Sequence, residues 1–226
     1  MIVNEIFYSL QGEGTLTGVP SIFVRLAGCP LRCQWCDTKY ALDNAAGEQY
    51  QIEDVLQAVK QWPSSYVVIT GGEPMVNPEL PQLVDRFKAA GKHITIETAG
   101  IAYIPDMPCD LMSISPKLSN SIPKNEKLAT VHEDSRLVLE VLSELIENYE
   151  YQLKFVVDSF SDLQEIEQTL EQFQNVDSQK VMLMPQAASR DELIAKSVMV
   201  ADMCKQTGYT FCQRLQILLW NNQKGT

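Results

Sequence analysis

The stretch SIFVRLAGCPLRCQWCDT, residues 21–38, joins an apolar, β-branched run to a loop that carries three cysteines. Its first half is typical of a buried strand. Similar runs recur downstream at 66–70, 93–97, 111–115, 153–157, 181–184 and 215–220. Amphipathic helix patterns lie between most of them, at 52–59, 80–87, 137–145, 163–173 and 190–207. This alternation predicts an α/β fold on a mostly parallel sheet, because parallel strands need crossover connections.

The organisation along the chain indicates one domain over residues 1–226. The sequence has no internal repeat, no low-complexity tract and no break in composition. The segment SPKLSNSIPKNEKLATVHEDS, residues 115–135, is polar and turn-rich, and we expect it to form a surface loop.

The charge and hydropathy of the chain exclude two classes of partner. A net charge of −11 leaves no basic field for a nucleic-acid backbone, so the ligands should be small. No apolar run approaches the ~18 residues of a membrane span, and the N-terminus lacks the basic and apolar regions of a secretion signal. We therefore expect a cytoplasmic protein that binds neither nucleic acid nor membrane.

Polar motifs follow five of the predicted strands. In parallel barrels and sheets the active site lies at the carboxyl ends of the strands. The motifs are GCPLRCQWCDT (28–38), GGEP (71–74), ETAG (97–100), SPK (115–117) and PQ (185–186). Their shared position predicts a functional site at this edge.

The strongest motif is the CxxxCxxC formed by Cys29, Cys33 and Cys36. Three thiolates on a short loop can bind three irons of a [4Fe–4S] cube and leave the fourth open to a ligand. The alternative is zinc, but structural zinc takes four ligands, and His93 and His132 have no matching spacing. The remaining cysteines, at 109, 204 and 212, are interpreted as buried core residues.

CPLRCQWC, with Trp35 before its last cysteine, resembles the cluster loop of the radical S-adenosylmethionine superfamily. The resemblance implies that S-adenosylmethionine binds the fourth iron and is cleaved there to a 5′-deoxyadenosyl radical. It also implies the cofactor-binding residues, which would be Trp35, Cys36, Asp37, Gly71, Gly72, Glu73, Ser115, Pro116, Lys117 and Gln186.

The N-terminal part narrows the resemblance further. NEIFYSLQGEG and the cluster loop, followed in order by TGGEP, IETAG, SPK and LQILLW, are similar to the 7-carboxy-7-deazaguanine synthases. That family has an incomplete TIM-type βα barrel. The resemblance implies a lyase that contracts the ring of 6-carboxy-5,6,7,8-tetrahydropterin to 7-carboxy-7-deazaguanine with loss of ammonia, in queuosine precursor biosynthesis. It also implies Mg²⁺, a homodimer, and a reducing protein such as a flavodoxin.

The substrate residues expected from this resemblance are Leu10, Gln11, Gly12, Glu13, Arg25 and Thr70, with Thr38 as the Mg²⁺ ligand. A carboxylate and an amide can pair with the N–H donors and the carbonyl of a pterin edge. The planar guanidinium of Arg25 can form two parallel hydrogen bonds with the substrate carboxylate. Its charge lies within an apolar strand, where burial is costly unless the charge is paired.

Two other functions remain open at this point. A glycyl-radical-enzyme activase shares the cluster loop and GGEP but needs an open groove for a peptide, whereas SLQGEG predicts a small polar pocket. A non-catalytic zinc or iron–sulfur module would need neither GGEP nor Arg25 and would not bind S-adenosylmethionine.

Overall fold

One curved sheet of nine strands runs through the part of the chain that the structure describes, in the order β3-β1-β2-β4-β5-β6-β7-β8-β9. The computed structural model describes residues 1–221 and 223–226. Strands β2 and β4 to β9 run parallel, β1 is antiparallel to β2, and β3 is antiparallel to β1. The strands are β1 (Ile2–Leu10), β2 (Pro20–Leu26), β3 (Glu48–Gln49), β4 (Tyr66–Gly71), β5 (His93–Thr98), β6 (Leu111–Ile114), β7 (Tyr151–Val157), β8 (Val181–Pro185) and β9 (Thr210–Phe211).

The sheet curls without closing into a full barrel. Its two edge strands are β3 and β9, which do not pair with each other among the described residues. The predicted incomplete barrel with a mostly parallel sheet is therefore confirmed. Its continuity from β1 to β9 supports the proposal that residues 1–226 form one domain.

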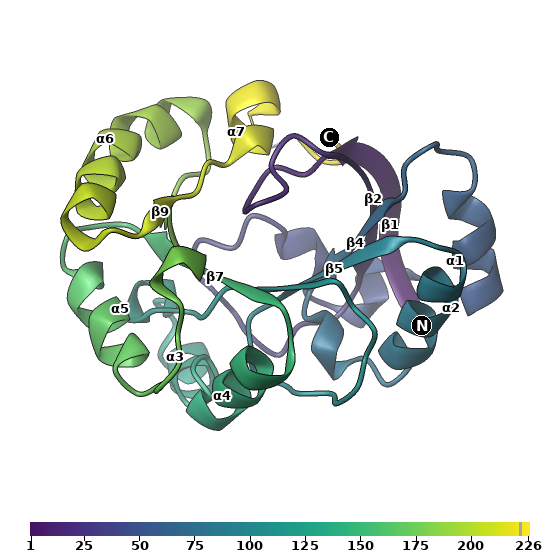
Figure 1. The fold of residues 1–226 in the computed structure, drawn as a ribbon, viewed down its shortest axis with the longest axis horizontal. Coiled ribbons are helices and arrows are strands. Elements are labelled where there is room, and N and C mark those ends of the chain that lie inside the picture. The colour runs from purple at the N-terminus through teal and green to yellow at the C-terminus, as the bar shows by residue number, and fades with distance from the viewer. Residues whose placement is uncertain (222) are drawn as a thin grey trace.

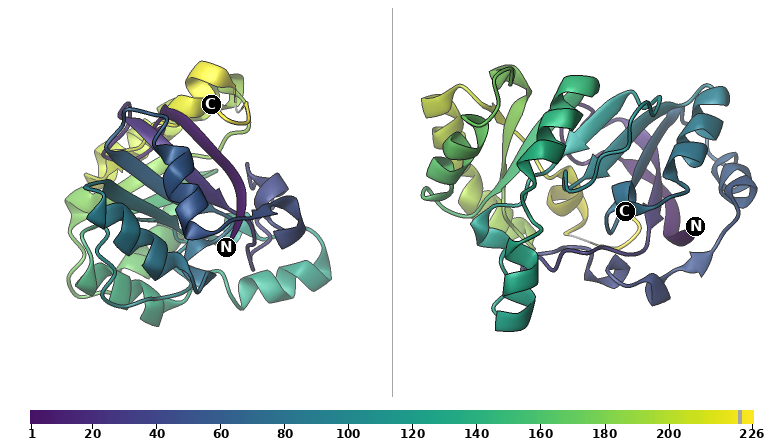
Figure 2. Two further views of the ribbon diagram at one scale, coloured as in Figure 1. Left: turned by 90° about the vertical axis from the view of Figure 1, so that its right-hand side faces the viewer. Right: turned by 90° about the horizontal axis from the view of Figure 1, so that it is seen from below.

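Helices cover the outside of this sheet. They are α1 (Ile52–Val59), α2 (Leu80–Ala89), α3 (Glu126–Glu133), α4 (Leu139–Asn148), α5 (Asp162–Leu170), α6 (Arg190–Thr207) and α7 (Leu215–Trp220). Figure 1 shows α4, α5 and α6 around one half of the sheet and α1 and α2 around the other. The two views of Figure 2 show α3 standing out on the same side as the segment that follows β2.

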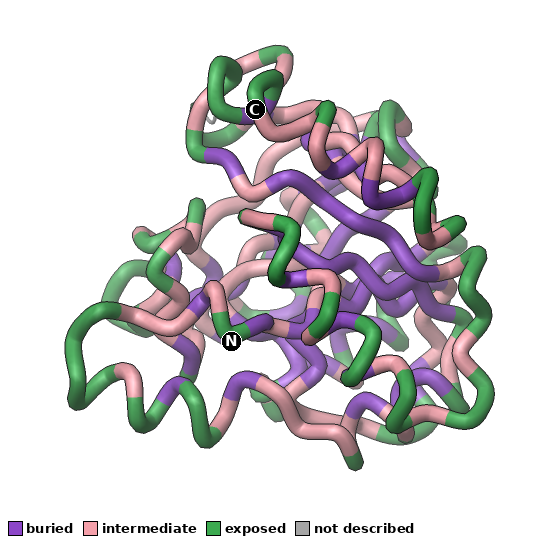
Figure 3. Tube along the Cα trace, turned by 90° about the vertical axis from the view of Figure 1, so that its left-hand side faces the viewer, coloured by how far each residue is buried: buried purple, intermediate pink, exposed green. Residues whose placement is uncertain are grey.

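The two faces of β7 have different roles because strand side chains alternate. Leu153, Phe155 and Val157 belong to the main hydrophobic core. The intervening Gln152 and Lys154 are also buried, but they face polar partners from other segments. Figure 3 shows that the buried segments gather in the strands and that exposed residues lie mainly in the outer turns.

Three segments differ from the sequence-based expectation. LQILLW forms helix α7 rather than a strand, because a short apolar run does not distinguish the two. The predicted loop at 115–135 contains α3, whose Asn125 side chain caps the Leu128 N–H at 3.2 Å. Residues 2–10, which were not expected to form a strand, pair as β1 along β2.

No helix among the described residues is long and apolar enough to span a membrane.

Candidate active site

The cysteine loop, residues 29–36, follows β2 and is held by contacts that do not involve its thiols. The indole N–H of Trp35 donates to the backbone oxygen of Asn120 at 2.9 Å. The backbone N–H of Arg32 donates to His132 Nδ1, at 3.2 Å, and His132 is buried on α3. The segment expected to be a surface loop therefore supports the cysteine loop.

The three thiols at 29, 33 and 36 are half-buried and line one cavity. Burial raises the pKa of Cys29 to about 12 and that of Cys33 to about 11. Thiolates at these positions need a strong positive charge to offset their burial, and iron supplies it. The donor set therefore fits a [4Fe–4S] cluster.

Gly71 and Gly72 bring the end of β4 against the backbone that leads into the cysteine loop. The Gly72 N–H donates to Leu26 O at 3.0 Å, and the Glu73 N–H donates to Gly28 O at 2.9 Å. A Cβ on Gly72 would lie 2.0 Å from Gly28 O, and Gly71 has φ +139°, a region that favours glycine. GGEP thus positions the cysteine loop as well as lining the cavity.

We predict that Gly72→Ala displaces the cysteine loop, because the Cβ would overlap backbone rather than a flexible side chain. The expected result is a loss of at least half of the bound iron after anaerobic reconstitution, together with a lower melting temperature. Iron analysis and circular dichroism measure the two effects. Gly91→Ala is the control: its φ of +71° also disfavours alanine, but no atom lies within 4 Å of the added Cβ. Full iron loading of Gly72→Ala would contradict the prediction.

The main cavity, of about 260 Å³, opens where the carboxyl ends of the strands meet. All but three of the site residues expected from the sequence line it. They are Leu10, Gln11, Gly12, Glu13, Arg25, Cys29, Cys33, Trp35, Cys36, Asp37, Thr38, Thr70, Gly71, Gly72, Ser115 and Lys117. The structure thus gathers residues that are more than 100 positions apart in the chain.

Glu73, Pro116 and Gln186 are not among the lining residues of the main cavity. Glu73 is 2% exposed, and its carboxylate accepts hydrogen bonds from Thr98 Oγ1 at 2.7 Å and the Ala99 N–H at 2.7 Å. Burial raises its pKa. The Gln186 side chain accepts a hydrogen bond from Lys196 on α6, at 2.7 Å.

Lys117 extends the cofactor side of the cavity. Its Nζ bonds to the hydroxyl of Ser115 at 2.9 Å and lies 5.9 Å from the centre of the Trp35 ring. This cation–π geometry connects the end of β6 to the cysteine loop.

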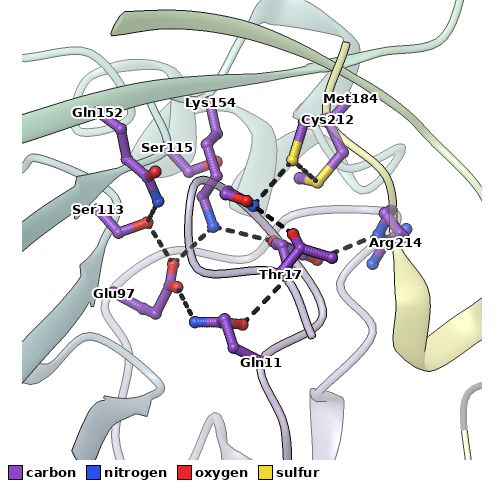
Figure 4. A network of polar contacts seen from close by, with 12 residues as sticks. Gln11, Thr17, Glu97, Ser113, Ser115, Gln152, Lys154, Met184, Cys212 and Arg214 are labelled. Atoms are coloured by element: carbon purple, nitrogen blue, oxygen red, sulfur yellow. Dashed lines mark hydrogen bonds and ion pairs between the residues drawn. The ribbon is translucent and has the colours of Figure 1, made fainter. Parts of the chain in front are cut away.

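A network of charged groups also lines the cavity, and Figure 4 shows its central part. Lys154 is 1% exposed, and its Nζ contacts Glu13 Oε2 at 3.0 Å and Glu97 Oε2 at 2.7 Å. Burial alone would raise the pKa of Glu13, but the cations of Lys154 and Arg214 bring it down to about 2. Burial likewise opposes the charge of Lys154, and the two carboxylates raise its pKa. Glu13 and Lys154 are therefore charged at neutral pH.

The same network fixes the loop that follows β1. Gln11 donates to Glu97 Oε1 at 3.1 Å, and the Ser113 hydroxyl donates to Glu97 Oε2 at 2.9 Å. Gln152 donates to Ser113 Oγ at 2.8 Å and accepts from the Thr15 N–H at 2.9 Å. Side chains from β5, β6 and β7 thus hold residues 11–15 over the end of the barrel (Figure 4).

Arg214, just before α7, joins three parts of the site. It bonds to Asp37 at 2.5 Å, to the Ala187 backbone oxygen at 2.7 Å and to Glu13 at 3.3 Å. Asp37 follows the last cysteine of the loop, and Ala187 follows β8. Burial disfavours the guanidinium charge, but Asp37 and Glu13 raise the pKa of Arg214. Arg214 therefore connects the cysteine loop to the substrate side of the cavity.

Arg25 is paired within the sheet rather than free. Its Nε donates to Glu5 on β1 at 2.6 Å, and the Tyr40 hydroxyl shares that carboxylate at 3.0 Å. Burial raises the pKa of Tyr40 to about 12. The remaining guanidinium nitrogens of Arg25 make no hydrogen bond within residues 1–221 and 223–226, so they are available to a ligand in the cavity.

Sequence reasoning included Glu97 only within the ETAG motif, and it missed Lys154, Arg214 and Gln216 as lining residues of the cavity. A signal existed for Glu97 and Lys154, because each charge interrupts an apolar strand, as Arg25 does. Arg214 and Gln216 carry no local signal, since their role depends on where α7 docks.

Comparisons with known proteins agree with this geometry. The family model described as the radical SAM superfamily matches residues 23–148. The 7-carboxy-7-deazaguanine synthase of Rhodopirellula baltica is 42% identical over 100% of this chain and 89% of that protein. That of Halobacterium salinarum is 38% identical over 99% of this chain and 92% of that protein.

Among solved structures, the crystal structure of QueE from Escherichia coli matches with a TM-score of 0.73 and 26% identity. The match covers 93% of this chain and 92% of that one. The cysteine loop, the incomplete barrel and the full-length similarity agree, and the chain therefore belongs to the 7-carboxy-7-deazaguanine synthases of the radical S-adenosylmethionine superfamily.

Proposed function

We propose that this chain is a radical S-adenosylmethionine lyase that converts 6-carboxy-5,6,7,8-tetrahydropterin to 7-carboxy-7-deazaguanine with loss of ammonia, toward queuosine. The observation that carries the proposal is one cavity that is lined both by the three cysteines and by the residues of the Glu13 network. The names of relatives that match over the full chain support the substrate and the product.

On the cofactor side, Cys29, Cys33 and Cys36 would hold the [4Fe–4S] cluster. With S-adenosylmethionine bound, the cluster supplies the reducing electron that generates the 5′-deoxyadenosyl radical. Trp35, Asp37, Gly71, Gly72, Ser115 and Lys117 line the adjoining part of the cavity and would contact the cofactor. Glu73, Pro116 and Gln186 do not line the cavity and would support the residues that contact the cofactor. Glu73 would do so by fixing the turn after β4 through its hydrogen bonds with the Met75 and Ala99 N–H groups.

On the substrate side, the unpaired nitrogens of Arg25 are proposed to bind the substrate carboxylate in a planar fork. The neighbouring Glu5 carboxylate fixes the direction of this guanidinium through Nε. Leu10, Gln11, Gly12, Glu13 and Thr70 line the space between Arg25 and the network, where the pterin ring would lie.

Thr38 is the proposed Mg²⁺ ligand. Its hydroxyl lies 3.7 Å from Cys36 Sγ and lines the cavity, so a cation there could share ligands with a substrate carboxylate. A cytoplasmic setting, a homodimer and a reducing protein such as a flavodoxin are proposed on the family resemblance.

Full-length similarity to the synthases disfavours both the glycyl-radical activase and the non-catalytic zinc or iron–sulfur module. Gln11 and Gly12 are buried, and hydrogen bonds with Glu97, Gln152 and Lys154 hold the loop 11–15 in place, which leaves little of the open surface that a peptide substrate needs.

The test is an assay of anaerobically reconstituted, reduced protein with S-adenosylmethionine, Mg²⁺ and 6-carboxytetrahydropterin, with the product identified by mass spectrometry. Formation of 7-carboxy-7-deazaguanine supports the proposal. Release of 5′-deoxyadenosine without that product would overturn the assigned substrate, and failure to form an iron–sulfur cluster would overturn the radical chemistry.

A further inference from the structure

Tyr40 connects two groups that the proposed function assigns to the substrate carboxylate. It belongs to the short helical turn Lys39–Ala41, two residues after Thr38, and it lines the main cavity together with Arg25. Its hydroxyl donates to Glu5 Oε1 at 3.0 Å, and the same oxygen accepts from Arg25 Nε at 2.6 Å. One carboxylate oxygen therefore joins the segment of Thr38 to the strand of Arg25.

An irregularity in β1 lets this strand hold Tyr40 at two points. The register of β1 against β2 shifts between Val3 and Glu5, which leaves Asn4 as an extra residue. Bulges of this kind change the direction of side chains next to them. The Asn4 side chain donates to Tyr40 O at 3.2 Å, while Glu5 accepts from the Tyr40 hydroxyl. Consecutive residues of one strand thus fix both the backbone and the side chain of Tyr40.

Aromatic rings also restrain the Arg25 guanidinium. Its central carbon lies 5.6 Å from the centre of the Phe7 ring and 5.9 Å from the centre of the Tyr40 ring. Rings at these distances attract the cation and limit its rotation. Arg25 lines the cavity whereas Glu5 does not, so the contact through Nε leaves the terminal nitrogens to the cavity.

The pairing of Glu5 with Arg25 uses only part of what the two groups can form. A carboxylate and a guanidinium often make two parallel hydrogen bonds. Here only Nε contacts Glu5 among the described residues, and the oxygen that accepts it is shared with the Tyr40 hydroxyl. Turning the carboxylate until its second oxygen meets a terminal nitrogen would disturb the bond to Tyr40. The hydroxyl therefore opposes a contact that would occupy a nitrogen needed by a ligand.

We propose that Tyr40 is a positioning residue for the substrate carboxylate: its hydroxyl keeps Glu5 on one nitrogen of Arg25 and so leaves the terminal nitrogens free to bind. This inference rests on the proposed function, which assigns the carboxylate to Arg25, and adds the group that keeps this arginine available. Because Tyr40 follows Thr38 by two residues, the same contact fixes the proposed Mg²⁺ segment relative to Arg25. Two groups that share one carboxylate need such a fixed separation.

The experiment measures how much the carboxylate of the ligand contributes to binding. Isothermal titration of reconstituted protein with S-adenosylmethionine and Mg²⁺ gives Kd for oxidised 6-carboxypterin, which is not turned over, and for pterin, which lacks the carboxylate. The proteins are the unaltered chain, Tyr40→Phe, Glu5→Gln and the double variant. The control is Tyr66→Phe: Tyr66 is also partly buried, but it does not line the cavity and its hydroxyl has no hydrogen-bond partner among the described residues.

We expect the unaltered protein to bind 6-carboxypterin about 30-fold more tightly than pterin. Tyr40→Phe keeps the ring and should lose about tenfold of this preference, because Glu5 can then take a second nitrogen of Arg25. Its affinity for pterin should change by less than about threefold, and Tyr66→Phe should match the unaltered protein.

The double variant separates positioning from a general loss of structure. Glu5→Gln removes the carboxylate that would compete, so adding Tyr40→Phe to it should change the preference by less than about twofold. In turnover, Tyr40→Phe should raise KM about tenfold and lower kcat by less than about threefold, because the carboxylate is retained from substrate to product. If Glu5→Gln does not fold, the comparison of Tyr40→Phe with Tyr66→Phe still decides the question.

The inference is overturned if Tyr40→Phe keeps the full preference, if it weakens the binding of both ligands equally, or if the unaltered protein does not distinguish them. Product formation with an unchanged preference in Tyr40→Phe would remove this inference and leave the proposed function standing. A preference that is lost in Tyr40→Phe, together with no deazaguanine product from the unaltered protein, would do the reverse.

Discussion

Replacing Cys33 with serine is expected to abolish cluster binding and with it all activity, while the chain stays folded. The anchors of the cysteine loop are the Trp35 indole, the Arg32 backbone N–H and the Gln34 N–H to Ser121 O at 2.9 Å, none of which uses a thiol. A serine hydroxyl is a poor replacement for a thiolate iron ligand. Iron content should fall from about four per chain to below about one, and product formation by more than about 10³-fold.

Cys109→Ser is the matched control for this prediction. Cys109 is also half-buried, and burial raises its pKa to about 12, but it does not line the main cavity. Iron content, the visible absorption of the cluster and far-ultraviolet circular dichroism should match those of the unaltered protein. A Cys33→Ser variant with a full complement of iron would contradict the ligand assignment.

Lys154→Met is expected to cause the largest loss of stability among single substitutions in the charged network. It removes the only lysine that contacts both Glu13 and Glu97 in the described residues, and so leaves two carboxylates facing each other in a buried wall. Breaking a buried ion pair from one side costs about 3–5 kcal/mol. For a chain of this size the melting temperature should fall by roughly 10 °C or more, as measured by circular dichroism on reconstituted protein.

Two further variants distinguish burial from loss of charge alone. Lys196→Met removes a partly exposed ion pair with Asp158 and the hydrogen bond to Gln186, and should lower the free energy of unfolding by only about 1–2 kcal/mol. The double variant Lys154→Met with Glu97→Gln should recover part of the loss, because it removes one of the two carboxylates. Equal effects of Lys154→Met and Lys196→Met would contradict the structural role of the network.

Most of the barrel could be predicted from the sequence, because its parallel strands are short apolar runs followed by turn motifs. The runs at 66–70, 93–97, 153–157 and 181–184 correspond to β4, β5, β7 and β8. LQILLW was assigned to the wrong class because six apolar residues fit a buried strand and a docked helix equally well. Helix α3 was missed because its eight residues carry little apolar periodicity and stand out from the body of the molecule.

From spacing alone the site was predictable only where its residues are close together in the chain, whereas Glu13, Arg25 and Thr70 were expected from the family resemblance. The cysteine loop and GGEP are local motifs whose position after a strand indicates their edge of the sheet. The wall made by Glu13, Glu97, Lys154, Arg214 and Gln216 draws on four different segments, and its pairing depends on how the sheet curls. A charge within an apolar strand needs a partner, and this rule was applied to Arg25. The same rule would have marked Lys154 and Glu97 as paired residues, but it would not have shown which residues they pair with.

The hydrogen bond between Glu13 and Gln216 has a consequence for biosynthesis. It joins residues 203 positions apart, so it cannot form until α7 has left the ribosome. At ~5–20 residues per second, the loop after β1 waits roughly 10–40 s for its last partner. During that interval Glu13 lacks Arg214 and, for most of it, Lys154, and the pocket stays hydrated and open. The wall made by Glu13, Lys154, Arg214 and Gln216 should therefore be among the last parts of the nascent chain to mature, because long-range contacts form after local ones.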